Sequence, residues 1–246
     1  MTKIVIVGGG VAGVTAAEAA RKASQDSEIT LVHDEPGLPY NRLNLTRMIA
    51  GEVTENELEL KKAPWYDEKS IVHLHDSVTG VQRDKKEITL KEGGQMPYGS
   101  LILATGANPF VPPIPGAEST GVATLRTLAD ARVILSSVKQ GTRCVCIGGG
   151  LLGIELAAGL SKRGGKVAVL EGSEWLLSRQ LAAQGAAILR ARLKEMGMDV
   201  RCGAKVKGIL GSPAVTGVAL ESGEALPADM VLVSTGVRPS LGLARD

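Results

Sequence analysis

The stretch that decides the fold is IVIVGGGVAGVTAAEAARKA, residues 4–23. The apolar run at residues 4–7 is typical of a strand buried on both faces of a parallel sheet. Glycines follow it at once, and the alanine-rich residues 14–23 have helical character. A second apolar run at residues 29–32 completes a strand–helix–strand unit of about 30 residues.

The same passage occurs again 140 residues further along the chain, where residues 144–147 lead into a second glycine run. A helix-like segment at 154–162 and a strand-like segment at 167–170 follow it. The tails also match, because both end in an apolar run that reaches Thr-Gly, at residues 105–106 and 235–236. Each half is therefore predicted to be a strand–helix–strand unit, a short β-ribbon and a returning strand. Duplication is the simplest explanation.

The expected fold class is α/β, with two Rossmann-like dinucleotide-binding domains. Each domain would have three layers around a parallel central sheet, with a β-ribbon insertion, and the second domain would be inserted in the first. The proline-rich residues 112–116 form a natural junction. We expect a first domain at residues 1–115, a second at residues 116–233, and a segment at residues 234–246 that returns to the first domain.

The glycine loops predict nucleotide binding because each lies between a strand and a helix. The first glycine allows the tight turn, the second lets the backbone approach a pyrophosphate, and the third lets the helix pack close to the strand. The phosphates would then bind free N–H groups at the positive end of the helix. The alternative is that both loops are structural turns. The glycines concerned are Gly8, Gly10 and Gly13 in the first loop, and Gly148, Gly150 and Gly153 in the second.

An acidic residue at the end of the second strand of each unit should accept hydrogen bonds from the adenosine ribose. In the second half this residue is Glu171, which favours NADH over NADPH, although Arg179 is near enough in sequence to reach a phosphate. In the first half the equivalent position is His33, and the acid is displaced to Asp34 or Glu35. Either of these two could equally be a solvated loop charge.

The composition is that of an ordinary globular α/β protein, with 44% hydrophobic and 22% charged residues. A net charge of +2 gives no reason to expect a nucleic-acid or membrane-surface partner. The three cysteines cannot form a disulfide framework, and the two at positions 144 and 146 are expected to be buried, inert thiols. The first apolar run is too short for a signal peptide or a membrane span, so we expect a cytoplasmic protein.

With these features in place, the chain resembles the pyridine nucleotide-disulfide oxidoreductase superfamily. Within it, the similarity is greatest to NADH:rubredoxin reductases and to the flavin-binding region of assimilatory nitrite reductases. The resemblance covers almost the whole chain. Besides the glycine loops, it depends on residues 39–43 (PYNRL), 103–106 (LATG), 125–131 (LRTLADA), 153–155 (GIE) and 234–239 (STGVRP).

The resemblance implies that the first half binds FAD and the second half NAD(H), and that no metal is bound. The expected FAD contacts, which include the two acids already named, are Gly8, Gly10, Val11, Ala12, Gly13, Asp34, Glu35, Arg42, Val78, Ala104, Thr105, Gly106 and Arg126. The expected NAD(H) contacts are Gly148, Gly150, Leu151, Leu152, Gly153, Glu155, Glu171 and Gly236.

Individual roles follow from the same resemblance. Arg42 would contact a phosphate or ribose, and Val78 would lie against the adenine. Thr105 and Gly106 would approach the flavin chain through their backbone, and Arg126 would pass near the pyrophosphate, unless it only caps a helix.

In the second half, Glu155 would lie near the nicotinamide, and Gly236 would border its channel. The alternative for Glu155 is an exposed acid in the first turn of a helix.

Many members of the superfamily carry a redox-active cysteine in the segment that reads YNRLNL here, at residues 40–45, and this segment has none. Thiol chemistry is therefore not expected, and we nominate no catalytic acid or base. The resemblance implies an FAD-dependent oxidoreductase that takes a hydride from NADH. Its electrons would go to an external acceptor, which is a rubredoxin- or ferredoxin-like protein or a fused or partner reductase.

Relatives continue beyond the position of residue 239 with a segment that completes the flavin site, and then with an interface domain. We therefore expect a truncated chain, a chain whose end is not represented, or a subunit completed by a partner, and an oligomer is conceivable. Two other functions stay open. One is a non-catalytic nucleotide-binding subunit or fragment, and the other is an NADH oxidase.

Overall fold

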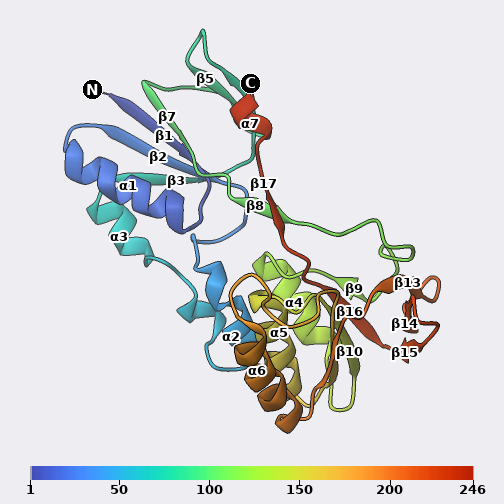
Figure 1. Ribbon diagram of the computed structural model, residues 1–246. Coiled ribbons are helices and arrows are strands. Elements are labelled where there is room, and N and C mark those ends of the chain that lie inside the picture. Colours follow the sequence, from blue (N-terminus) through green and yellow to red (C-terminus); the bar gives the residue numbers. More distant parts are fainter. Residues whose placement is uncertain (1, 246) are drawn as a thin grey trace. The chain divides into compact units, whose positions relative to one another are not determined.

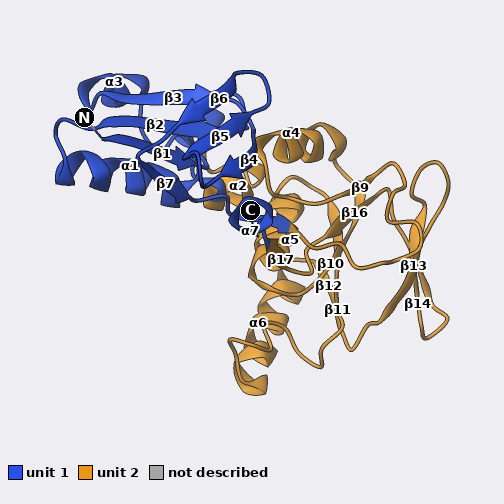
Figure 2. Cartoon of the chain, turned by 90° about the horizontal axis from the view of Figure 1, so that it is seen from above, with its two compact units in different colours: residues 1–42, 55–108, 239–246 blue, residues 43–54, 109–238 orange. Residues whose placement is uncertain are grey.

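The protein is described by a computed structural model that covers residues 2–245. Contacts divide the chain into two compact units, coloured in Figure 2. Unit 1 comprises residues 1–42, 55–108 and 239–246, and unit 2 comprises residues 43–54 and 109–238. These limits differ from the expected domains mainly because residues 43–54 pack with unit 2.

Unit 1 is built on a four-stranded parallel sheet in the order β3-β2-β1-β7 (Figure 1). These strands are β1 (Lys3–Val7), β2 (Glu28–His33), β3 (Ile71–His75) and β7 (Ser100–Leu103). Almost every residue of β1 and β2 is buried or half-buried, because both faces of the sheet are covered. The continuous apolar runs predicted from the sequence are therefore the central strands.

Helices cover one face of this sheet and a β-ribbon covers the other. The helical face carries α1 (Val11–Ala23) and α3 (Ala63–Glu68), which join it in one hydrophobic cluster. The opposite face packs against an antiparallel ribbon of β4 (Val78–Gln82), β5 (Glu87–Leu90) and β6 (Gly94–Pro97). Unit 1 therefore has the three layers that the sequence predicts.

Unit 2 repeats this architecture around a five-stranded parallel sheet in the order β12-β11-β10-β16-β9. Its strands are β9 (Val122–Ala123), β10 (Arg143–Ile147), β11 (Lys166–Glu171), β12 (Asp199–Cys202) and β16 (Met230–Val233). In both units the strand that precedes the glycine loop is a central strand of its sheet.

The two faces of the unit 2 sheet are covered in the same way. One packs against an antiparallel ribbon of β13 (Val206–Leu210), β14 (Gly217–Leu220) and β15 (Ala225–Pro227). The helices of the unit are α4 (Leu128–Ser137), α5 (Leu151–Lys162) and α6 (Ala183–Glu195), of which α5 packs on β10 and β11, and α6 on β12. The predicted α/β class with two Rossmann-like units is confirmed.

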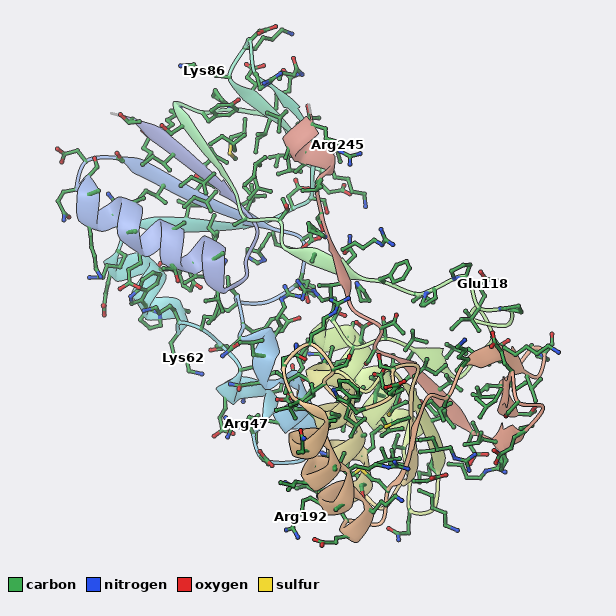
Figure 3. The ribbon with its side chains drawn as sticks, in the orientation of Figure 1. Arg47, Lys62, Lys86, Glu118, Arg192 and Arg245 are labelled. Carbon is green, nitrogen blue, oxygen red and sulfur yellow. The ribbon has the colours of Figure 1, made fainter. Side chains whose placement is uncertain are left out.

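The short helix α2 (Leu45–Ile49) belongs to unit 2 although its sequence lies within the first half. It packs on α4 and α5. The Arg163 guanidinium, just after α5, donates hydrogen bonds to the carbonyl oxygens of Ile49 and Met48. Figure 3 labels Arg47, whose side chain projects from α2. Nothing in the apolar pattern of residues 43–54 predicts this placement.

The chain passes between the units at residues 42–43, 54–55, 108–109 and 238–239. The last two of these places lie within β8 (Ala107–Pro109) and β17 (Val237–Pro239), which form a two-stranded sheet. After β17 the return segment joins unit 1, where the Thr105 hydroxyl donates to the Ser240 carbonyl at 2.8 Å. It ends in α7 (Gly242–Arg245), and Leu243 packs on the ribbon side of the sheet. Unit 2 is thus inserted in unit 1, as predicted. No helix within residues 2–245 is long and apolar enough to cross a membrane.

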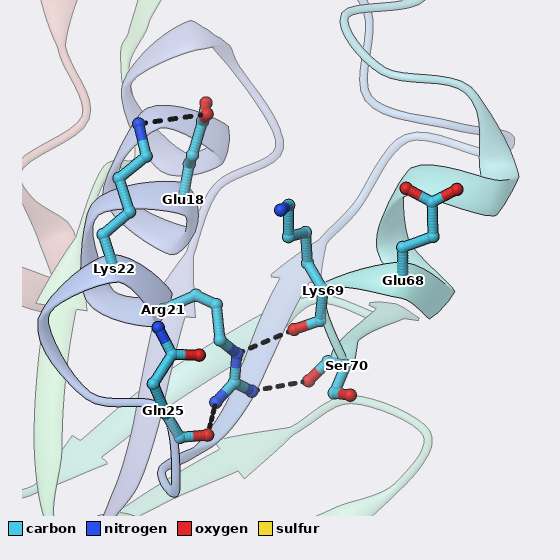
Figure 4. Close-up of a pocket in the computed structure, with 7 residues that line it drawn as sticks. All are labelled: Glu18, Arg21, Lys22, Gln25, Glu68, Lys69 and Ser70. Carbon is cyan, nitrogen blue, oxygen red and sulfur yellow. Dashed lines mark hydrogen bonds and ion pairs between the residues drawn. The ribbon is translucent and has the colours of Figure 1, made fainter.

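A buried arginine joins the ends of two helices in unit 1. The Arg21 side chain is 9% exposed and lines a small surface pocket beyond the end of α1 (Figure 4). Its guanidinium donates to the carbonyl oxygens of Lys69 (2.7 Å) and Ser70 (2.8 Å), which follow α3. It also donates to those of Gln25 (2.6 Å) and Ser24 (3.3 Å), which follow α1. A cation between two helix C-termini is favourable because it faces the negative ends of both helix dipoles.

We predict that Arg21→Met lowers the free energy of unfolding of unit 1 by about 3 kcal/mol, because four carbonyl oxygens lose their donors. Urea unfolding followed by circular dichroism measures this loss. Lys22→Ala is the matched control, since Lys22 is an exposed neighbour on the same helix whose side chain forms an ion pair with half-buried Glu18. Equal urea midpoints for the two variants would show that the Arg21 hydrogen bonds do not stabilise unit 1.

Candidate nucleotide-binding sites

In the glycine loop of unit 1, main-chain atoms pack closely against other main-chain atoms, with no room for a side chain between them. A Cβ atom added at Gly8 would lie 2.1 Å from the carbonyl oxygen of Ala104, and one added at Gly13 would lie 1.8 Å from the carbonyl oxygen of Gly8. Gly8 also has a φ of +120°, which residues with a side chain rarely adopt. These two glycines are therefore required by the fold itself, which holds the start of α1 close to β1 and β7.

Gly10 is different, because a Cβ atom added there would meet nothing within 4 Å. It is the N-cap residue of α1, and no side chain of the described residues caps this helix. The first turn of α1 contains no acidic residue, and its first residue, Val11, is exposed and apolar. The amides of this turn therefore have no polar side chain over them. Open space and uncapped amides at the positive end of a helix are what an anionic phosphate requires, so the site fits a pyrophosphate.

Unit 2 reproduces this arrangement residue for residue. Gly148 has a φ of +113°, and a Cβ atom there would lie 2.4 Å from the carbonyl oxygen of Ser234. A Cβ atom at Gly153 would lie 2.1 Å from the carbonyl oxygen of Gly148, whereas at Gly150 it would meet nothing within 4 Å. The helix α5 has no side-chain cap either. In each loop, therefore, the fold requires the first and third glycines of the motif, whereas the second leaves open space.

A cavity of about 620 Å³ opens at the glycine loop of unit 2. Leu151 and Leu152, at the start of α5, are 62% and 39% exposed and leave an apolar surface in the cavity. Gly236, with a φ of +113°, also lines the cavity. The predicted NAD(H) residues that line this cavity are Gly148, Gly150, Leu151, Leu152, Glu171 and Gly236.

Glu171 ends β11 and faces this cavity, where both of its carboxylate oxygens accept backbone hydrogen bonds. The Gly149 amide donates to Oε2 and the Ser173 amide donates to Oε1, both at 2.7 Å. A carboxylate oxygen can accept more than one hydrogen bond, so a ribose hydroxyl can still be bound.

Glu155 lies outside the residues that line the cavity. It is exposed on α5 just beyond the first turn, and its carboxylate accepts a hydrogen bond of 3.0 Å from the Thr46 hydroxyl of α2. Its expected position near the nicotinamide stays a prediction, and the structure gives it a partner that the sequence did not predict.

In unit 1 the residues after β2 surround a small cavity of about 20 Å³ lined by Gly9, Asp34, Glu35 and Arg42. The Glu35 carboxylate accepts a hydrogen bond of 2.5 Å from the Tyr40 hydroxyl and forms an ion pair of 2.9 Å with Arg42. Asp34 is exposed and Glu35 is half-buried. Glu35 is thus built into the site, but which of the two acids binds the ribose stays open.

His33 occupies the position of the ribose acid in unit 1, since His33 ends β2 as Glu171 ends β11. The ring is 5% exposed, and Nδ1–H donates to the carbonyl oxygen of Glu35 at 2.9 Å. Nε2 is buried and has no partner among the described residues. Burial lowers the pKa of this imidazole below 6.5, and the nearby His73 and His75 lower it further. His33 is therefore a neutral ring beneath the loop, not a ribose acceptor.

The other predicted FAD residues lie at the expected edge of the unit 1 sheet, with one exception. Ala104, Thr105 and Gly106 follow β7, and Val78 begins β4, half-buried against the sheet. Arg126 lies instead in unit 2, next to the N-cap of α4, and its backbone amide donates to the Asp130 carboxylate at 2.9 Å. The contacts of these residues with FAD stay predictions.

Apart from Arg179, the loop at residues 172–181 is a part of the candidate site that the sequence did not predict. It folds back on the glycine loop, where the Leu177 amide donates to the Gly149 carbonyl at 3.1 Å. Leu177 has a φ of +52°, although it is not glycine. The loop adds Ser173, Ser178 and Arg179 to the cavity, and Lys205 joins them after β12. A loop without periodicity carries no sequence signal apart from its position after the second strand.

The three cysteines are free thiols and are unsuited to redox catalysis. Cys144 and Cys146 are buried in β10, where burial raises the pKa of Cys144 to about 11 and that of Cys146 still further. Burial also raises the pKa of Cys202. The expectation of inert thiols at positions 144 and 146 agrees with these shifts, because a thiol must ionise to act as a nucleophile.

A family model described as "Pyridine nucleotide-disulphide oxidoreductase" matches residues 2–246. The chain belongs to this family. The resemblance inferred from the sequence is therefore confirmed.

Among its relatives is a nitrite reductase [NAD(P)H] of Bacillus subtilis, 34% identical over 99% of this chain and 31% of its own length. A chlorobenzene dioxygenase ferredoxin reductase component of a Cupriavidus species is 37% identical, over 99% of this chain and 60% of its own length. A rubredoxin-NAD(+) reductase of Pseudomonas putida is 33% identical, over 99% of this chain and 64% of its own length. The chain thus spans about a third to two thirds of these relatives.

The fold is also similar to that of the reductase in a covalent putidaredoxin reductase–putidaredoxin complex. The TM-score is 0.93 at 33% identity, and the match covers 99% of this chain and 60% of the solved chain.

The buried His33 ring predicts that unit 1 loses stability in acid. A group whose pKa is lowered on folding binds a proton more readily when unfolded, so its contribution is complete above pH 6.5 and falls as the pH drops below it. The slope from one such group is at most about 1.4 kcal/mol per pH unit. His33→Leu should flatten the dependence of stability on pH between 7 and 5, as measured by urea unfolding. Val32→Ala, at the buried apolar neighbour of His33 in β2, is the control, since it lowers stability without changing a titratable group and should leave the slope as it is. An unchanged slope in His33→Leu would contradict this account.

Proposed function

We propose that the chain is the nucleotide-binding part of an FAD-dependent oxidoreductase that takes a hydride from NADH and passes electrons to an external acceptor protein. Residues 1–115 would form the main part of the FAD-binding domain, residues 116–233 the NAD(H)-binding domain, and residues 234–246 the return segment. The free thiols are compatible with a reducing, cytoplasmic location, which is part of the proposal.

The observation that supports this function best is the pair of open glycines, Gly10 and Gly150. Each caps a helix, and each faces space that a Cβ atom would enter without touching protein. Since the fold does not require glycine at these two positions, the open space there favours a bound ligand. Two such positions at matching places in two units imply two dinucleotides.

The side chains of the chain itself would bind and orient the cofactors. The uncapped amides of α1 and α5 would each hold a pyrophosphate, and Glu171 would accept a ribose hydroxyl. Arg42, fixed by its ion pair with Glu35, would neutralise phosphate charge at the unit 1 site. When bound, FAD supplies the hydride-accepting and electron-transferring chemistry, and the protein supplies position and electrostatics.

The acceptor is proposed to be a ferredoxin- or rubredoxin-like protein, or a fused or partner reductase. Two relatives are named as a ferredoxin reductase component and a rubredoxin-NAD(+) reductase. The raised thiol pKa values also leave no cysteine of this chain suited to an internal relay.

Purified protein should be yellow, and NADH should bleach the flavin absorbance near neutral pH in the absence of oxygen. A colourless protein that releases no flavin on heating, but still binds NADH, would instead favour the non-catalytic nucleotide-binding subunit. Oxygen consumption that persists at full rate when a rubredoxin or ferredoxin is supplied would favour the NADH oxidase.

Gly10→Val should abolish flavin retention, because its side chain would fill the phosphate space. The fold should survive, since Gly10 has an extended backbone (φ −78°, ψ −177°) that valine adopts readily and no neighbour within 4 Å. Gly150→Val is the matched variant, which should keep flavin and lose NADH binding. Flavin content by absorbance and NADH binding by calorimetry separate the two. Flavin retained at the normal level in Gly10→Val would contradict the assignment of this loop.

A further inference from the structure

We propose that unit 2 has a second ligand site, which binds an aromatic carboxylate in a groove lined by α6, residues 174–176 and Cys202. The groove has a volume of about 580 Å³ and shares no lining residue with the nucleotide cavity. Volumes of this size are typical of sites for small molecules. The proposal is therefore independent of the proposed function.

The loop at residues 172–181 separates the two spaces. Residues 174–176 line the groove, whereas Ser173 and residues 177–180 line the nucleotide cavity. The carbonyl of Ser173 and the amide of Leu177 are both hydrogen-bonded to main-chain atoms outside the loop. The residues that face the groove are thus held in place from both sides, and a site that is already formed loses little entropy when a ligand binds.

Trp175 gives the groove an aromatic surface. Its indole Nε1–H donates to the Leu181 carbonyl at 3.0 Å, which restrains the half-buried ring and occupies its one donor. The groove is also lined by Ala183, Ala187 and Ala191, which are exposed and follow one another at intervals of four residues along one face of α6. These methyl groups leave room beside an indole on which a second aromatic ring can stack.

Two cations of α6 supply positive charge. Arg190 and Lys194 line the groove, and they repel each other because they lie four residues apart on one face of the helix. Both are exposed, and neither forms an ion pair within residues 2–245, whereas Arg192 of the same helix pairs with Glu195. Burial raises the pKa of the Cys202 thiol, and the charges of Arg190 and Lys194 act against that rise, so their charge reaches the groove.

The sum of these charges favours a carboxylate over a phosphate. Glu174 is the one acidic residue among the described residues that line the groove, so the two cations leave a single net positive charge. A carboxylate carries one negative charge, and the planar guanidinium of Arg190 can bind it through two parallel hydrogen bonds. A phosphate dianion would bring a second negative charge toward Glu174. A flat ring that bears one carboxylate therefore matches both the apolar and the charged residues of the groove.

The test uses 2-naphthoate as the probe and 2-naphthalenemethanol, which has the same rings, as its neutral counterpart. Calorimetry on the purified chain should give a dissociation constant of about 100 μM or lower for 2-naphthoate, and the neutral compound should bind roughly tenfold more weakly or worse. Arg190→Ala and Lys194→Ala should each weaken 2-naphthoate by about fivefold or more, the loss expected for one charge-assisted contact. Ala187→Leu should also weaken it, because leucine fills the space while it suits a helix.

Arg192→Ala is the matched control, because Arg192 is an exposed arginine of the same helix that pairs with Glu195 and does not line the groove (Figure 3). It should leave the affinity for 2-naphthoate unchanged, and saturating 5′-AMP should not displace the probe. The site is wrong if 2-naphthoate does not bind, if the neutral compound binds equally well, or if Arg190→Ala and Lys194→Ala have no more effect than the control. Displacement by 5′-AMP would place the probe in the nucleotide cavity and overturn the site as well. Each of these results leaves the proposed function standing.

Discussion

Both units depend on a contact between main-chain atoms that leaves no room for a side chain. In unit 1 the loop after β1 lies against the carbonyl oxygen of Ala104, and the start of α1 lies against the carbonyl of Gly8. The equivalent contacts in unit 2 are made by Ser234 and Gly148. This close approach fixes the first turn of each helix relative to the strand edge, so its amides point to one defined position. Phosphate binding requires that precision, since hydrogen bonds weaken steeply with misalignment.

The two units share this contact but differ in what surrounds it, and the difference is clearest at the end of the second strand. Unit 2 places the Glu171 carboxylate there, where it faces a cavity and is held by two amides. Unit 1 places the His33 imidazole there, where burial keeps it neutral and Nδ1–H positions the Glu35 backbone. A carboxylate could not be buried so completely without a partner. Two residues further along, the Glu35 carboxylate has such partners, since it accepts a hydrogen bond from Tyr40 and pairs with Arg42.

Much of this architecture could be predicted from the sequence because local patterns determine it. Apolar runs such as residues 4–7 and 144–147 became the central strands, and the glycines after them became helix starts. The features that escaped prediction depend on partners far away in sequence. Arg163 binds carbonyls of α2 more than a hundred residues earlier, and Arg21 spans from α1 to the end of α3. The fold of the 172–181 loop depends on Gly149 and Glu171, which no periodicity links to it. The strand ends could be predicted because local apolar runs define them, whereas these contacts depend on residues distant in sequence.

The thiols constrain how electrons can leave such a protein. The family is named for disulphide chemistry, but in this chain two of the three cysteines occupy a central strand that the duplicated fold requires to be apolar. Burial raises their pKa values because a thiolate in an apolar layer loses its hydration. Cys144 and Cys146 therefore act as small hydrophobic residues, and packing explains them without any redox role. In the proposed function, the electrons of a hydride taken from NADH would therefore leave through the flavin and not through a thiol of this chain.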